Sequence, residues 1–275
     1  MKTLFISDLD GTLLSDNALP TAFTAKTVNT LIEKGMNFSV ATSRSIHDAT
    51  EILEKFNFKT PVITMNGTFI SDLSGTPKAL YYNKIPNEYL ETLTEIFIKH
   101  NCPPNVYTFA DEKLSIEFVE MKHDMQERFF KAREFSYNSF KKVDKYNLSG
   151  EVVFISIIGY EENIKAAERE IKERVPEVNC VSYKDNYEKH GWFLEVSHSL
   201  SNKADALKKL KEMGGFERVV AFGDNINDLP LFSVADVKIA VENAKQEVKE
   251  MSDLVIGKNT DDAVAKYLLN YFSGE

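Results

Sequence analysis

The sequence of 275 residues predicts an α/β protein in which a doubly wound parallel sheet carries an inserted α+β segment. Three observations support this prediction. The first and last thirds alternate short apolar runs with stretches that have the apolar spacing of helices, which is typical of βαβ units. The middle third has a different texture, with consecutive strand-like runs. Acidic and hydroxyl-bearing residues directly follow several predicted strands, where doubly wound sheets bind ligands.

The N-terminal third contains three predicted strands and two predicted helices. Gly35 follows the first of these helices, and glycine is a common helix terminator because it adopts a left-handed conformation at little cost. The predicted strands are 4–7, 37–41 and 61–65, and the predicted helices are 21–34 and 45–56.

The C-terminal third repeats this alternation. Its predicted helices are 202–213, 228–233 and 260–271, and its predicted strands are 219–222, 238–241 and 254–256. The middle third contains predicted helices at 86–100 and 161–174 and predicted strands at 106–110, 114–119 and 152–158. We therefore expect a core domain of residues 1–81 and 188–275, and an inserted domain of residues 82–187.

The net charge limits the classes of partner that the protein is expected to bind. A net charge of -9 argues against nucleic acid and anionic membranes, because no basic excess exists to neutralise phosphates. A single lysine and a metal ion still suffice for a small phosphorylated ligand.

Cys102 and Cys180 are isolated, which indicates neither a disulfide framework nor a zinc site and fits a reducing cytoplasm. The N-terminal apolar run ends at Asp8, too early for a signal peptide, and no apolar stretch could span a bilayer. We expect a cytoplasmic protein, and no obligate protein partner is evident.

Two carboxylates follow the first predicted strand, in the segment Asp8-Leu9-Asp10-Gly11-Thr12. They share a face only if the chain stays extended between them. Two close carboxylates repel each other, and a divalent cation bound by oxygen relieves the repulsion. One carboxylate can then attack an electrophile while the other moves protons. The alternative is an ordinary strand end followed by an Asp-Gly turn.

Hydroxyl groups follow the second predicted strand, at Thr42 and Ser43, just before Arg44. A hydroxyl and free amides at the start of the next helix form a cradle for phosphate. The alternative is an ordinary helix N-cap.

A second acidic segment, Gly-Asp-Asn-Ile-Asn-Asp at 223–228, follows the predicted strand 219–222. Asp224 and Asp228 offer the oxygen ligands that a hard cation prefers, although such a turn also caps helices. Lys203 opens a predicted helix, where most lysines are solvated surface residues.

In their order along the chain (8–12, Thr42, Lys203 and 223–228), the four segments resemble the motifs of the haloacid dehalogenase superfamily, and the resemblance spans the whole chain. The large insertion between Thr42 and Lys203, with Ala-Thr-Ser-Arg at 41–44 and Thr-Met-Asn-Gly at 64–67, resembles the Cof-type branch with a type IIB cap. Ser43 departs from that branch, which usually has glycine there, but its backbone amide is kept. The resemblance implies a Rossmann-like core and a cap domain.

The resemblance also implies an activity. A phosphatase of this kind hydrolyses a small phosphorylated metabolite, such as a sugar or sugar-alcohol phosphate, with Mg²⁺ as cofactor. Asp8 would be the nucleophile that forms an aspartyl-phosphate, and Asp10 would act as general acid and then general base. Asp8, the Asp10 carbonyl and Asp224 would bind Mg²⁺, and Asp228 would orient that shell.

The remaining roles concern the substrate. The resemblance implies that Thr42 and Lys203 bind the phosphoryl oxygens, with the Ser43 amide beside them. Asn227 would reach the phosphoryl group or the metal's waters, and Arg44 and Asn66 are candidates for substrate or cap contact at the rim of the core.

Two other functions stay open. A phosphomutase similar to phosphomannomutase would yield an isomerised sugar phosphate instead of free phosphate. A non-catalytic sugar-phosphate sensor would not need a nucleophile. Substrate identity is expected to depend on the insertion, where Tyr183, Asn186 and His190 are candidate contacts, with surface or packing positions as the alternative.

Overall fold

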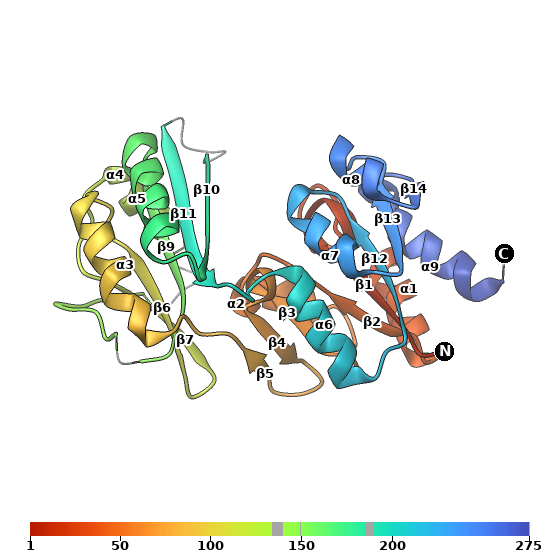
Figure 1. Cartoon of the computed structure of the whole chain (residues 1–275). Coiled ribbons are helices and arrows are strands. Elements are labelled where there is room, and N and C mark those ends of the chain that lie inside the picture. Colours follow the sequence, from red (N-terminus) through yellow and green to blue (C-terminus); the bar gives the residue numbers. More distant parts are fainter. Residues whose placement is uncertain (134–139, 149, 185–189, 275) are drawn as a thin grey trace. The chain divides into compact units, whose positions relative to one another are not determined.

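The computed structural model describes residues 1–133, 140–148, 150–184 and 190–274 (Figure 1). The chain divides into two compact units. The core unit comprises Met1–Tyr81 and Asn202–Glu275, and the inserted unit comprises Tyr82–Ser201.

A parallel five-stranded sheet forms the centre of the core unit. Its strand order is β14-β13-β12-β1-β2. The bounds are β1 Thr3–Ser7, β2 Asn37–Val40, β12 Arg218–Gly223, β13 Val237–Val241 and β14 Leu254–Ile256. After β1 the chain builds outward through β2, and after the insertion it builds outward in the other direction from β12. The strand order therefore reverses between β1 and β12, which makes this the switch point of a doubly wound sheet and confirms the predicted fold class.

Helices complete the core unit. Their bounds are α1 Ala22–Glu33, α2 Ile46–Leu53, α6 Lys203–Gly214, α7 Leu229–Val234, α8 Gln246–Met251 and α9 Ala263–Ser273. Thr21, Ser45 and Asn202 begin three of them, and each side chain accepts a hydrogen bond from the backbone amide three residues later. The strands are apolar on both faces because α1 packs with α9 and α6 packs with α7 around the sheet.

A small sheet in the order β3-β4-β5, in which β3 and β4 are antiparallel, follows the second helix. Its strands are β3 Val62–Thr64, β4 Phe69–Asp72 and β5 Lys78–Tyr82. The sequence predicts only the first of these three strands. The turn that joins β3 to β4, Met65–Gly67, contains Met65 and Asn66 at positive φ, and it reappears below beside the candidate site.

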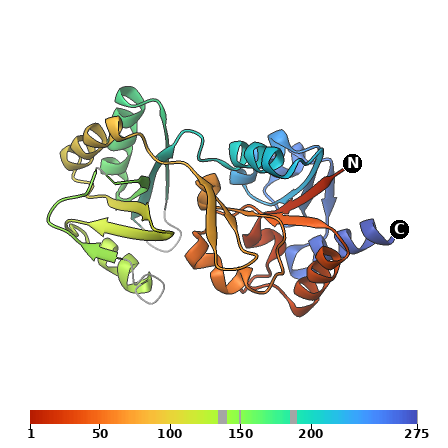
Figure 2. The ribbon, with the colours of Figure 1, turned by 90° about the horizontal axis from the view of Figure 1, so that it is seen from below.

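The inserted unit contains a six-stranded sheet in the order β10-β11-β9-β6-β7-β8. The strands are β6 Asn105–Ala110, β7 Lys113–Phe118, β8 Phe140–Lys142, β9 Val152–Tyr160, β10 Val178–Lys184 and β11 Gly191–His198. The helices are α3 Asn87–Lys99, α4 Asp124–Arg133 and α5 Glu161–Arg174. α3 and α5 pack side by side and share one apolar cluster with the sheet (Figure 1 and Figure 2).

The C-terminal boundary of the inserted unit lies later than the sequence predicted, at residue 201 and not at residue 187. β11 pairs antiparallel with both β9 and β10, and Leu194 and Val196 lie in the apolar cluster of the inserted unit. The inserted unit therefore extends to Ser201, because the segment after residue 187 supplies a central strand to its sheet.

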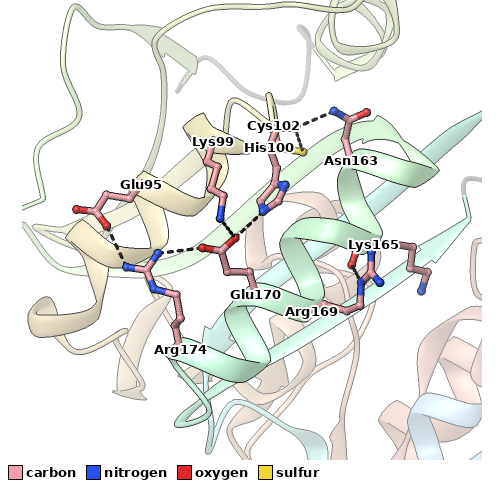
Figure 3. Close-up of polar contacts among 9 residues, drawn as sticks. All are labelled: Glu95, Lys99, His100, Cys102, Asn163, Lys165, Arg169, Glu170 and Arg174. Carbon is pink, nitrogen blue, oxygen red and sulfur yellow. Dashed lines mark hydrogen bonds and ion pairs between the residues drawn. The ribbon is translucent and has the colours of Figure 1, made fainter.

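Charged side chains join α3 to α5 on the outside of this unit (Figure 3). Glu170 Oε2 lies 2.7 Å from both Lys99 Nζ and His100 Nε2, and Glu170 Oε1 accepts a hydrogen bond of 3.0 Å from Arg174. Arg174 also binds Glu95. The bond from Lys99 is the largest of several that lower the pKa of Glu170 to about 2. These contacts join α3 to α5.

None of the helices in the described part of the chain combines the length and the apolar character that crossing a lipid bilayer requires.

Candidate active site

Two adjacent strand ends bring the acidic residues together. β1 and β12 are parallel neighbours, with Ser7 opposite Phe222, and the Asp8 amide donates to the Phe222 carbonyl at 3.0 Å. Asp8 and Asp224 therefore leave the sheet side by side at the switch point. This is the edge at which the sequence places the candidate site.

Lys203 lies buried between two of these carboxylates. Its Nζ is 2.6 Å from Asp8 Oδ1 and 2.7 Å from Asp228 Oδ1, and its side chain is 1% exposed. The alternative of a solvated surface lysine is therefore wrong. Removing a charge from water costs several kcal/mol per ion unless partners of opposite charge compensate it, and here two carboxylates do so.

The position of Lys203 depends on close packing around the first residue of α6. A Cβ added to Gly67 would lie 2.3 Å from the carbonyl oxygen of Asn202, so the turn Met65–Gly67 rests directly on the start of α6. Gly67 also has a φ of +101°, which favours glycine. The Thr-Met-Asn-Gly segment, which precedes the insertion in the sequence, thus helps to position Lys203, which follows it.

Asp8, Asp224 and Asp228 each offer one oxygen within 4.8 Å of the others. Asp228 is fixed by its second oxygen, which accepts hydrogen bonds from the amides of Asp224 at 3.0 Å and Asn225 at 3.1 Å. A Cβ at Gly223 would lie 2.7 Å from the Asp228 Cβ, so this turn requires glycine. The alternative of a capping turn is also correct, because Asn225 and Asp228 form a capping box.

The charge balance of this cluster suits a divalent cation. Burial raises the pKa of Asp224 to about 6, with a hydrogen bond from Thr12 opposing the shift and Asp228 reinforcing it. Burial also holds the pKa of Asp8 well above its ordinary value, although Lys203 opposes this. Burial lowers the pKa of Lys203, but attraction to Asp8 and Asp228 outweighs it and leaves that pKa raised. Three carboxylates face one ammonium group, so the donor set fits Mg²⁺, which prefers oxygen ligands.

Asp10 does not join the acidic cluster. Its carboxylate is 44% exposed and accepts two hydrogen bonds from Arg44, at 2.7 Å from Nε and 2.5 Å from Nη2. Asp10 raises the pKa of Arg44 through these bonds. The sequence placed both residues at the site but gave no indication of this pairing, because 34 residues separate them.

Thr42 is buried at the end of β2, but its surroundings correct one expectation. Its amide donates to the Ile63 carbonyl at 3.0 Å, and the Arg44 amide donates to Thr42 Oγ1 at 3.1 Å. These two amides are occupied and are not free for a phosphate cradle. Thr42 follows β2, the strand on the other side of β1, and Ser43 is exposed next to it.

Asn66 has an unsatisfied acceptor. Its amide donates to the Thr42 carbonyl at 3.0 Å, which ties the β3–β4 turn to the end of β2. Its side-chain Oδ1 is buried and has no hydrogen-bond partner among the described residues. A buried acceptor costs about 1–3 kcal/mol when it is left unpaired, so this atom is suited to a ligand donor. Asn227, by contrast, is exposed on the 3₁₀ turn Ile226–Asp228.

The sheet of the inserted unit has a polar row that the sequence analysis missed. Asn105, Ser156 and Glu195 lie directly opposite one another on β6, β9 and β11, so their side chains share a face. The residues that follow them face α3 and α5 through the apolar cluster, as shown by Val106, Ile157 and Val196. Ser156 is a single polar residue inside the apolar run of β9, and Glu195 stands between Leu194 and Val196 on β11; such isolated polar positions in apolar strands are the signal that could have revealed the row.

Tyr183 also belongs to this polar face. Its hydroxyl donates to Glu195 Oε1 at 2.6 Å, and its ring stacks on Phe193 with centroids 5.4 Å apart. Burial raises the pKa of Glu195, and the bond from Tyr183 opposes that shift. Of the other candidate contacts in the insertion, His190 is exposed and Asn186 lies outside the described residues.

Comparison with known proteins identifies one family. A family model described as haloacid dehalogenase-like hydrolase matches residues 5–268. A putative phosphatase of Haemophilus influenzae is 31% identical over 97% of this chain and 96% of its own. The Bacillus subtilis protein YitU, named a 5-amino-6-(5-phospho-D-ribitylamino)uracil phosphatase, is 26% identical over 98% of this chain and 97% of its own.

Solved structures show the same fold. A haloacid dehalogenase-like hydrolase from Bacteroides thetaiotaomicron superposes with a TM-score of 0.78 at 23% identity, over 99% of this chain and 100% of its own. The Thermotoga maritima protein TM0651 superposes with a TM-score of 0.77 at 26% identity, over 98% of this chain and 97% of its own.

Proposed function

The chain belongs to the haloacid dehalogenase-like hydrolase family and is a phosphoric monoester hydrolase, and we propose that it cleaves a small phosphorylated metabolite through an aspartyl-phosphate. The observation that carries this proposal is the buried contact of 2.6 Å between Lys203 Nζ and Asp8 Oδ1, within the cluster that Asp224 and Asp228 complete. An ammonium group at this place neutralises charge where a carboxylate must approach an anionic phosphoryl group.

Asp8 acts as the nucleophile in this proposal. One of its carboxylate oxygens forms a bond to phosphorus, and the bond from phosphorus to the alcohol oxygen breaks. Asp10 donates a proton to the departing alcohol. Asp10 then takes a proton from water, whose oxygen attacks phosphorus and releases phosphate and the free Asp8 carboxylate. While both oxygens of Asp10 accept bonds from Arg44, the carboxylate has no proton to give. Asp10 must therefore leave Arg44 and take a proton from solvent before it can protonate the departing alcohol.

The metal site follows from the same cluster. Asp8, Asp224 and the Asp10 carbonyl would hold Mg²⁺, and Asp228 would fix the arrangement through its bonds to the Asp224 and Asn225 amides. Bound there, Mg²⁺ supplies positive charge to the phosphoryl oxygens. The Lys203 ammonium group and the Thr42 hydroxyl bind the phosphoryl oxygens directly. Asn66 Oδ1 accepts a hydrogen bond from a substrate hydroxyl group, which would satisfy the buried acceptor.

We further propose that the inserted unit acts as a cap that selects the substrate. In the polar row, Asn105 and Ser156 are buried, whereas Glu195 is partly exposed and the neighbouring Tyr183 is exposed. Glu195 and Tyr183 are therefore the groups of this face that are suited to hydrogen bonds with a polyhydroxylated leaving group. The name of YitU describes action on a phosphorylated ribityl compound, which supports a sugar or sugar-alcohol phosphate as the substrate class.

Phosphate release from a panel of sugar and sugar-alcohol phosphates tests the proposal. Free phosphate is the expected product, whereas an isomerised sugar phosphate would indicate a mutase and binding without turnover would indicate a sensor. Asp8→Asn is the matched variant, because it is almost isosteric and removes the nucleophile. It should lose activity and the covalent phosphate detected by mass spectrometry. Turnover in that variant would disprove the covalent mechanism.

A further inference from the structure

One turn of the core unit contacts both acidic turns of the candidate site. The turn of residues 242–245 follows β13. Within it, Asn243 Nδ2 donates to the Gly11 carbonyl at 2.7 Å, and the Lys245 amide donates to the Asp224 carbonyl at 2.8 Å. The sequence analysis assigned no role to this turn.

Asn243 is fixed at both ends of its side-chain amide. Its Oδ1 accepts a hydrogen bond of 3.0 Å from the Asn259 amide. Asn259 is itself buried, and its Nδ2 donates to the Leu14 carbonyl at 2.9 Å. Two asparagines therefore hold the loop that carries Asp10, one at Gly11 and the other at Leu14.

The conformation at Gly11 leaves little freedom. Gly11 has a φ of +80°, and a Cβ placed there would lie 2.5 Å from Asp224 Oδ2. Its neighbours on both sides belong to the site, since Asp10 precedes it and Thr12 Oγ1 donates to Asp224 Oδ1 at 2.8 Å. A rotation of the Gly11 peptide would therefore displace Asp10 and loosen Thr12 from Asp224 together.

We propose that Asn243 is a positioning residue for hydrolysis, which acts by fixing the Gly11 carbonyl and through it the Asp10 side chain and the Asp10 carbonyl. The inference rests on the proposed function. It predicts a loss in kcat with little change in KM, because Asn243 contacts neither Thr42 nor Lys203. It also predicts weaker Mg²⁺ binding, because neighbours that orient metal ligands typically contribute ~10–100-fold to metal affinity or activity.

The chain offers a matched control in Asn29. Its Nδ2 donates to the Lys55 carbonyl at 3.0 Å, and its Oδ1 accepts from the Asn57 amide at 2.8 Å. Asn29 thus makes the same pair of bonds to a loop of the same unit. That loop precedes β3, whereas the site lies where β1 and β12 end.

The experiment compares Asn243→Ala, Asn243→Asp and Asn29→Ala in the full chain. Asn243→Asp keeps the shape and the acceptor but removes the donor to Gly11, so it tests the proposed bond even if Asn243→Ala folds poorly. Steady-state kinetics give kcat and KM, and calorimetry gives the Mg²⁺ affinity of the metal-free protein without reference to turnover. Both Asn243 variants should lose ~10–100-fold in kcat and bind Mg²⁺ several-fold more weakly, with KM nearly unchanged.

Asn29→Ala should match the wild type in kcat and Mg²⁺ affinity. Wild-type values of both quantities in Asn243→Asp, or equal losses in Asn29→Ala, would overturn the positioning role. A wild-type chain that neither binds Mg²⁺ nor releases phosphate would instead overturn the proposed function, and the positioning role with it. The two failures are therefore distinguished by the protein in which they occur.

Discussion

Lys203 and Asp8 are 195 residues apart in the sequence, yet their charged groups meet at 2.6 Å inside the core unit. Asp228 Oδ1 accepts a hydrogen bond of 2.7 Å from the same ammonium group. The pairing places a single buried cation between the predicted nucleophile and the carboxylate that fixes the turn after β12. Most of the testable consequences of the site follow from this arrangement.

Lys203→Ala should lower kcat/KM by at least ~100-fold, because loss of a preorganised charge-stabilising group typically has that effect. Lys203→Arg should restore only part of the activity, since a planar guanidinium does not copy a compact ammonium group. Lys208→Ala is the control on the same helix, where the side chain is 62% exposed and pairs with Asp205. Phosphate-release kinetics of the three variants check the prediction, which fails if the two alanine variants behave alike.

Metal removal should abolish activity. Chelation leaves the three carboxylates of Asp8, Asp224 and Asp228 with the Lys203 ammonium group but no metal ion to balance them, and Mg²⁺ should restore phosphate release. Ca²⁺ should inhibit, because it imposes a larger and looser coordination shell than Mg²⁺. The measurement is phosphate release after dialysis against EDTA with each cation added back. Full activity in excess EDTA would contradict the metal site.

Asp224→Asn should stabilise the metal-free protein above pH 6 while it abolishes activity. Burial raises the pKa of Asp224 from 3.8 to about 6, so the native state binds this proton more tightly than the unfolded state. Stability is therefore lost as the pH rises from about 4 to about 6, and an uncharged side chain avoids the loss. The gain should be at most about 2–3 kcal/mol, at 1.4 kcal/mol per pKa unit.

Thermal unfolding of the metal-free proteins from pH 4 to pH 8 measures this effect. The Tm of Asp224→Asn should exceed that of the wild type by an amount that increases as the pH rises. Addition of Mg²⁺ to the wild type should reduce this difference. A constant difference across this range would mean that the carboxyl group of Asp224 is not under electrostatic strain.

Glu195→Gln should change substrate preference more than it changes the chemistry. The variant keeps the size of the side chain and an acceptor for Tyr183 but loses the carboxylate of the polar row. We expect the ratio of kcat/KM between sugar and sugar-alcohol phosphates to shift by about 10-fold or more, in line with the ~1.5–3 kcal/mol contributed by hydrogen bonds to charged groups. Glu162→Gln, at an exposed position on α5, is the control and should leave the ratio unchanged.

The sequence by itself determined the five strands of the parallel sheet, the core helices other than α8, and the places where chemistry is expected. Apolar runs in β1 and β12 and the cap signals at Thr21, Ser45 and Asn202 are local, so a short window of sequence predicts the strands and helix starts. Parallel strands end at one edge of the sheet, which is why Asp8 and Asp224 could be placed together before any contact was known.

Only the tertiary structure decided which side chains contact one another and how. The burial of Lys203, the bonds from Arg44 to Asp10 and the bond from Asn243 to Gly11 join residues far apart in sequence, and no local pattern encodes them. The extent of the inserted unit was decided in the same way, because β11 belongs to it through pairing with β9 and β10. Pairing and burial depend on what the rest of the folded chain brings to a residue, and that is the physical reason why they emerge only from the whole fold.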